Sequence, residues 1–148
     1  MRKRNTKMRL SLKGDGLYAF RNSQPTAPAE VQRIMNLIRT AYERLKSGHG
    51  TERDFDHVGA AMNIGLIRAE SIGQPLVEAF KQAGAAMLEC VTRYRTGGRF
   101  GFSGLGILAM NAAMDDYESV LAASSPNQME QAAQEGAARI RRNEFLTA

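Results

Sequence analysis

Apolar residues return every three or four positions in five stretches of the chain, and this spacing places them on one face of an α-helix. The first stretch, from Ala27 to Ser47, has the most regular pattern. Thr26 is expected to cap its start, Pro28 suits a first helical turn, and Gly48 suits a helix end. The predicted buried face of this helix contains Val31, Ile34, Met35, Ile38, Ala41, Tyr42 and Leu45.

Four further helices are predicted, and each has a start signal or follows a break. Thr51 and Asp54 have the spacing of a capping box, so the second helix is expected to run from there to Gly73. Gln74 and Pro75 then open the third. Residues 96–106 contain five glycines, which disfavour a helix interior, and the fourth helix is expected over 105–123. A fifth is expected after Ser125, which has the capping-box spacing with Gln128.

This pattern predicts an all-α protein, a compact four- or five-helix bundle over residues 28–148. Short connections between long helices favour antiparallel neighbours, so the first three helices are expected to lie side by side. Residues 1–27 are expected to form a separate basic arm and linker. Within them, apolar residues alternate around Gly14 and Gly16, which makes a short β-hairpin possible.

Composition narrows the class of protein. The 148 residues suit one domain, with 43% hydrophobic and 24% charged residues as in ordinary globular proteins. The longest uncharged stretch, 100–114, is interrupted by glycines and polar residues, so no membrane helix is expected. The N-terminus lacks the apolar core of an export signal, and Cys90 is the only cysteine. These features predict a cytoplasmic protein without an internal disulfide.

The net charge of +5 is concentrated at the N-terminus. Residues 1–13 contain six basic residues and no acid, and the remaining chain is nearly neutral. A basic arm on a neutral body is typical of sequence-independent nucleic-acid binding, although a solubilising tail would have the same composition. The predicted nucleic-acid contacts in the arm are Arg2, Lys3, Arg4, Lys7, Arg9 and Lys13.

A second basic segment surrounds the glycine-rich break. Arg95 and Arg99, followed by Phe100 and Phe102, could hold a phosphate and stack bases, or contact a protein partner. Alternatively, the two phenylalanines close the open end of the bundle, which is the preferred interpretation. The arginines are therefore predicted nucleic-acid contacts, and the phenylalanines are candidate partner contacts.

No pattern of catalytic or metal-binding residues emerges. His57 follows Asp54 at one Glu-x-x-His-like spacing without a second such pair, and Cys90 has no neighbouring histidine. We therefore expect no enzyme, no cofactor and no metal. Ala132 and Gly136 have the spacing of a helix-turn-helix, but Glu135 and Arg142 occupy positions that should be apolar, so a continuous helix is expected.

Four short strings of residues stand out together: 47–51 with 54–56, 63–70, 98–102 and 124–130. In these strings the chain resembles a family of short proteobacterial proteins without an assigned function. Some members of the family carry the label of regulators of the factor-for-inversion-stimulation type, which the missing helix-turn-helix pattern does not support. The resemblance implies no catalytic residue.

The sequence leaves two hypotheses for the function of the protein. The first is a non-enzymatic binding protein that engages nucleic acid through its basic arm, either as a single chain or as a homodimer. The alternative is a protein-interaction adaptor or inhibitor, for example a mobile-element product that acts on a host complex through a helical face and residues 100–105.

Overall fold

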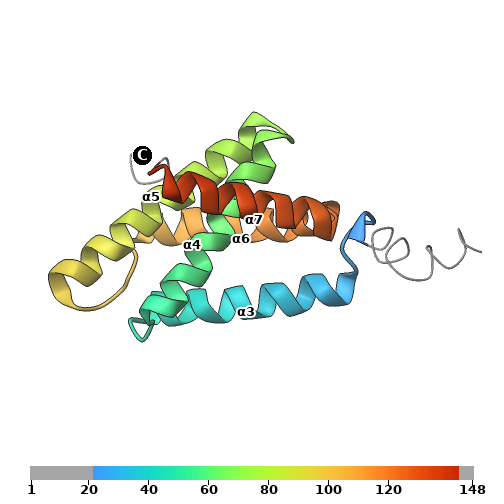
Figure 1. The fold of residues 1–148 in the computed structure, drawn as a ribbon. Helices are drawn as coiled ribbons and strands as arrows, with labels where there is room; N and C mark the ends of the chain where they lie inside the picture. Colours follow the sequence, from blue (N-terminus) through green and yellow to red (C-terminus); the bar gives the residue numbers. More distant parts are fainter. Residues whose placement is uncertain (1–21, 144–148) are drawn as a thin grey trace, which may run out of the picture.

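The computed structural model describes residues 22–143, and its regular elements over this range are α-helices (Figure 1). The basic arm and the possible hairpin lie outside the described residues. The five helices are α3 (Pro28–Ser47), α4 (Glu52–Glu70), α5 (Gln74–Gly97), α6 (Gly104–Ala123) and α7 (Pro126–Arg141). The all-α prediction is thus confirmed for this part of the chain.

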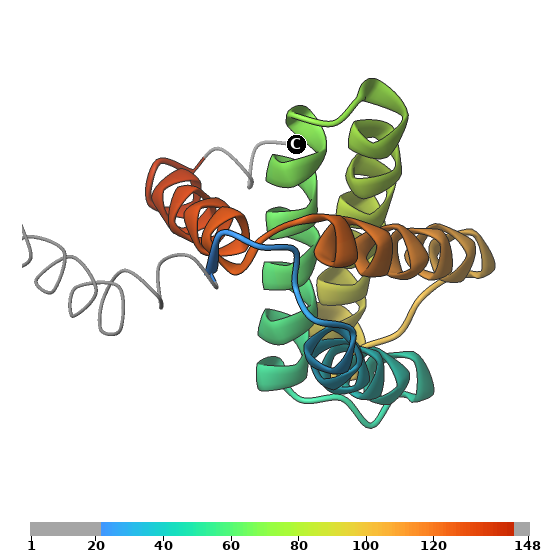
Figure 2. The same ribbon diagram turned by 90° about the vertical axis from the view of Figure 1, so that its right-hand side faces the viewer.

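Helix α4 lies at the centre of the bundle and packs against each of the other four helices. Helices α4 and α5 run antiparallel and side by side, whereas α3, α6 and α7 cross them (Figure 1, Figure 2). The expectation that the first three helices lie side by side is therefore correct only for α4 and α5. One cause of the close α4–α5 approach is Gly65, where a Cβ atom would overlap the buried ring of Phe80.

The start of α3 differs from the sequence prediction. Ala27, not Thr26, occupies the N-cap position, and its side chain makes no capping hydrogen bond. A residue before proline favours extended backbone, and Ala27 has φ −60° and ψ 141°. Thr26 instead donates two hydrogen bonds to the carbonyl of Ser124, from its backbone N–H (3.0 Å) and its hydroxyl (2.8 Å). This pair fastens the start of α3 to the α6–α7 connection.

The predicted capping boxes of α4 and α7 are both confirmed. The Thr51 hydroxyl accepts the backbone N–H of Asp54, whose carboxylate accepts the backbone N–H of Thr51 in return. Ser125 and Gln128 repeat this exchange at α7. Helix α4 ends at Glu70, slightly before the predicted Gly73, and Ser103 caps α6 through the N–H of Gly106.

Candidate interaction surfaces

The described bundle has no net charge. Residues 22–143 contain thirteen basic and thirteen acidic side chains, so the whole net charge of +5 comes from outside them. Many of these charges are already paired across helices, such as Arg39 with Asp115 and Arg139 with Glu70. The predicted arm contacts at positions 2, 3, 4, 7, 9 and 13 lie outside the described residues.

Arg95 and Arg99 are both exposed, at the end of the bundle where α5 leads into α6 (Figure 1). The Arg99 guanidinium lies over the α3–α4 turn, about 3.5 Å from where a Cβ atom on Gly48 would stand. Neighbouring Arg93 pairs with Glu89. The structure therefore brings the two predicted arginines to one end of the molecule, where the charge of neighbouring Arg93 is already paired.

Phe100 and Phe102 are buried, with 4% and 8% of their surfaces exposed. The Phe100 ring is stacked on Phe55 and on Tyr94, with centroids 5.4 Å and 4.1 Å apart, and Phe102 meets the edge of Tyr42 at 5.6 Å. Closing the bundle is thus their role in this structure. The expectation that they offer a surface to a partner is corrected, because packing on the core is more favourable for two aromatic rings than exposure to water.

The candidate chemical groups stay apart. The described residues contain no group of three or more His, Cys, Asp or Glu side chains arranged to hold a metal ion. His57 is exposed, and the His49 ring nitrogen lies 3.3 Å from the Ser47 hydroxyl. Cys90 is fully buried, and burial raises the pKa of its thiol, which keeps it in the unreactive protonated form.

Helix α7 is continuous through the positions tested for a helix-turn-helix. It runs from Pro126 to Arg141, as predicted. Its two buried residues, Ala132 and Gly136, allow close packing, and a Cβ atom on Gly136 would stand 3.5 Å from Ile67 of α4. The four-residue spacing is therefore a packing feature between two helices.

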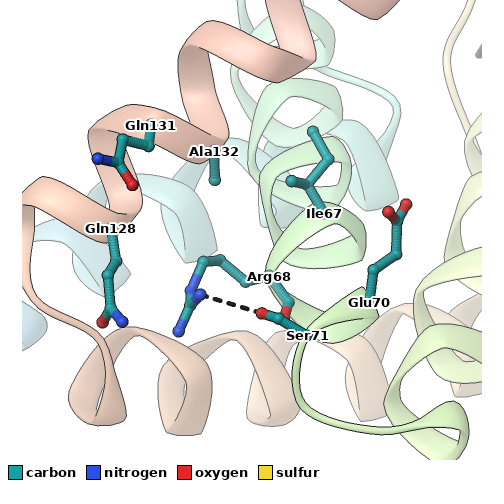
Figure 3. Close-up of a pocket in the computed structure, with 7 residues that line it drawn as sticks. All are labelled: Ile67, Arg68, Glu70, Ser71, Gln128, Gln131 and Ala132. Carbon is teal, nitrogen blue, oxygen red and sulfur yellow. Dashed lines mark hydrogen bonds between the residues drawn. The ribbon is translucent and has the colours of Figure 1, made fainter.

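A polar pocket of about 360 Å³ lies between α4 and α7 (Figure 3). Its arginine, Arg68, donates hydrogen bonds to the hydroxyls of Ser71 and Ser124, at 3.1 Å each. The Gln128 side chain serves the α7 capping box, and Glu70 pairs with Arg139, whose hydrogen bonds lower the pKa of this carboxyl group. Since these polar groups already hold the helices together, the pocket is better explained as part of the α4–α7 junction than as a ligand site.

An apolar groove between α5 and α6 is the surface that sequence reasoning missed. It has a volume of about 490 Å³, and two exposed leucines stand on its α6 wall: Leu105 is 81% exposed and Leu108 is 66% exposed. We call this feature the α5–α6 groove; it is lined by Gln82, Ala85, Ala86, Glu89, Ser103, Leu105, Gly106, Leu108, Ala109 and Ala112.

The α5–α6 groove has a fixed end and a floor of small residues. At that end the Glu89 carboxylate accepts the backbone N–H of Ser103 at 2.9 Å, and Ser103 caps α6. Ala86 and Gly106 are buried beneath the groove. Apolar residues at 105, 108, 109 and 112 were a signal available in the sequence, because this second stripe lies off the stripe of α6 that is buried.

No helix among residues 22–143 is long and apolar enough to cross a membrane. Comparison of the chain with protein-family models, with curated proteins and with solved structures finds no match. The resemblance to short proteobacterial proteins therefore stays a prediction.

Proposed function

We propose that this protein is a non-enzymatic binding protein that attaches to nucleic acid through residues 1–13. The observation that carries the proposal is the separation of charge: six basic residues without an acid precede a bundle of zero net charge. The phosphate backbone attracts such a segment regardless of base sequence. Arg95 and Arg99 are exposed and add a second, weaker contact in this proposal.

The absence of sequence-reading features on the bundle supports electrostatic attachment over base recognition. Helix α7 is continuous and buries the residues that a helix-turn-helix would use for its turn. The aromatic rings of the α5–α6 connection are buried and cannot stack on bases in this arrangement. The proposal further places the protein in the cytoplasm, where nucleic acid is present and the Cys90 thiol stays reduced.

The test is a fluorescence-anisotropy titration of the full chain against labelled duplex DNA, single-stranded DNA and RNA at several salt concentrations. We expect affinity to fall steeply with salt, with a log–log slope of up to about −5 for duplex DNA if all six arm cations contact phosphates. Replacing the six arm residues by Gln in the full chain should abolish most binding. Absence of binding at low salt contradicts the proposal.

Two double variants of the bundle test whether Arg95 and Arg99 contribute to binding in addition to the arm. Arg95→Gln with Arg99→Gln removes the predicted contacts, and Lys81→Gln with Arg141→Gln removes the same charge elsewhere on the exposed surface. We expect the first pair to weaken binding more than the second at equal salt. Equal effects would show that only total charge matters and would remove Arg95 and Arg99 from the site.

A second candidate function, a protein-interaction adaptor or inhibitor, is favoured by a different observation, the exposed leucines of the α5–α6 groove. The buried phenylalanines cannot provide its contact surface, so Leu105 and Leu108 take that place. Under this alternative, partner binding would survive neutralisation of the arm and be lost on Leu108→Glu.

A further inference from the structure

Helix α6 has two apolar faces, and the bundle covers only one of them. The buried face contains Gly106, Met110, Ala113, Met114, Tyr117, Val120 and Leu121. On the other side, Leu105, Leu108, Ala109 and Ala112 follow the i, i+3, i+4, i+7 spacing of a helix–helix contact. A helix that is apolar all round normally has neighbours on all sides. The outer stripe therefore lacks a partner within the described residues.

The exposed stripe and its groove combine large projecting side chains with a recess between small residues. Leu105 and Leu108 project from the surface, and the adjacent groove has a floor of alanine and glycine that leaves room for large side chains. A surface with projections and hollows side by side is complementary to a copy of itself. Two-fold symmetric dimers use the same patch on both subunits and require this property.

The order of residues along α6 fits an antiparallel pairing. If a two-fold axis passes between positions 108 and 109, Leu108 of one copy lies opposite Ala109 of the other, and Leu105 lies opposite Ala112. Each leucine then lies opposite an alanine, which makes four such contacts across the interface. Such alternation of large and small residues permits helix axes to approach within the usual range of about 8–10 Å.

Charge also favours the antiparallel arrangement. The N-terminal end of α6 has the positive end of the helix dipole and lies beside the ion pair of Arg93 with Glu89, whose carboxylate accepts the Ser103 N–H. The C-terminal half of α6 carries Asp115 and Glu118, which pair with Arg39, and Asp116. Asp116 is half-buried and stands one turn beyond Ala112, in line with the apolar stripe. An antiparallel pair places Asp116 of each copy near the N-terminus of the other α6, while a parallel pair would set the two Asp116 side chains against each other.

We propose that the α5–α6 groove is a self-association surface, and that α6 of a second copy of this chain occupies it in a two-fold dimer. Ten residues line the groove, fewer than the roughly 20–30 a side of a standard stable interface. The dimer is therefore weak and forms with increasing protein concentration. This assignment is independent of nucleic-acid binding, although a dimer would present two basic arms to one polyanion.

Sedimentation equilibrium of the full chain tests the proposal. We expect the average mass to rise from 16.3 kDa toward twice that value as the concentration increases from low to high micromolar. Leu108→Glu should weaken association at least about tenfold, because it places a charge in the centre of the interface. Leu88→Glu is the matched control, since Leu88 is 52% exposed on α5 and does not line the groove.

Cross-linking provides a second measurement that does not depend on the folding of the charged variant. A thiol in Leu108→Cys lies beside the proposed two-fold axis and should form an intermolecular disulfide on oxidation, whereas Leu88→Cys should not. A mass that stays at 16.3 kDa at high concentration overturns the proposal. Equal loss of association in both Glu variants, or preferential cross-linking at position 88, overturns this choice of surface.

Discussion

Asp54 shows how one side chain fixes the start of a helix. Its carboxylate accepts the backbone N–H of Thr51 at 3.0 Å and a hydrogen bond from Arg44 at 3.2 Å. The Thr51 N–H is the main reason that the pKa of Asp54 is lowered, and Arg44 lowers it further. The charged form of Asp54 is therefore the form that stabilises the folded state.

We expect Asp54→Asn to lower the free energy of unfolding by about 1 kcal/mol at neutral pH, a usual cost for weakening a helix cap. Because the folded-state pKa is depressed, the stabilisation is complete above the unfolded pKa near 3.9 and is lost as the pH falls through the folded value. Urea unfolding at neutral and acidic pH measures this. A difference between the two proteins that does not shrink in acid would contradict the assigned role of the charge.

Among single residues, capping pairs are the features that the sequence predicts best. Thr51 with Asp54 and Ser125 with Gln128 interact over three positions, so local spacing specifies them. Thr26 behaves differently, because its acceptor is the carbonyl of Ser124, far along the chain. A local pattern contains no information about such a distant partner, and the predicted N-cap was therefore one residue from the observed one.

At the level of helices, two glycines in similar helical surroundings have opposite roles. A Cβ atom on Gly65 of α4 would overlap Phe80, which is only 1% exposed and has no room to move. Gly84 of α5 is exposed and has no atom within 4 Å of such a Cβ. Gly65 is thus required by helix packing, while Gly84 is not.

We expect Gly65→Ala to destabilise the fold by about 1–2 kcal/mol, since overpacking outweighs the gain in helix propensity. Gly84→Ala should stabilise it by about 0.5–1 kcal/mol, because alanine restricts the unfolded chain without a clash. Thermal and urea unfolding of both variants measure the difference. A stabilised Gly65→Ala variant would show that Phe80 leaves room for a methyl group at the contact between α4 and α5.

The existence of five helices follows from periodicity, but their crossing does not. Apolar stripes on α3, α4 and α5 give the buried face of each helix without the direction of its neighbour. That direction depends on particular close contacts, such as Phe80 against Gly65, between residues distant in sequence. The exposure of the outer stripe of α6 has a related cause, because it depends on where α5 lies beside α6.

Across the whole molecule, stability is expected to be uneven. Helix α4 buries six residues and contacts all four other helices, whereas α7 buries only Ala132 and Gly136 and packs against α4. Arg139 strengthens this attachment by pairing with Glu70 and Glu135. Elements with few buried apolar contacts open before the rest of a protein.

Hydrogen exchange measured by mass spectrometry should therefore show the amides of α7 exchanging before those of α4 and α5. Arg139→Gln should speed exchange in α7 and leave α5 unchanged, because the ion pairs lost with Glu70 and Glu135 connect α7 to α4 and to itself. Simultaneous exchange of α7 and α4 in both proteins would instead indicate one cooperative unit.

Some features of the interaction surfaces could be predicted from the sequence, and others could not. The charge of residues 1–13 follows from composition, and the exposure of Arg95 and Arg99 follows from their positions in the last turn of α5 and in the glycine-rich connection after it. The burial of Phe100 and Phe102 agrees with the preferred interpretation, since Tyr94, Phe55 and Tyr42 provide aromatic neighbours. The α5–α6 groove required the relative placement of two helices, which no local pattern contains.

The bond between Thr26 and Ser124 has a consequence for how the protein is made. The two residues are 98 positions apart, and both are buried. The chain leaves the ribosome with its N-terminus first, so Thr26 emerges long before the Ser124 carbonyl that accepts its hydrogen bonds. The start of α3 can be fastened only after α3 to α6 have all been synthesised. Nascent chains that stall before Ser124 has emerged would therefore expose the start of α3 to proteases and chaperones. Chains that extend past Ser124 can form the two hydrogen bonds and protect it.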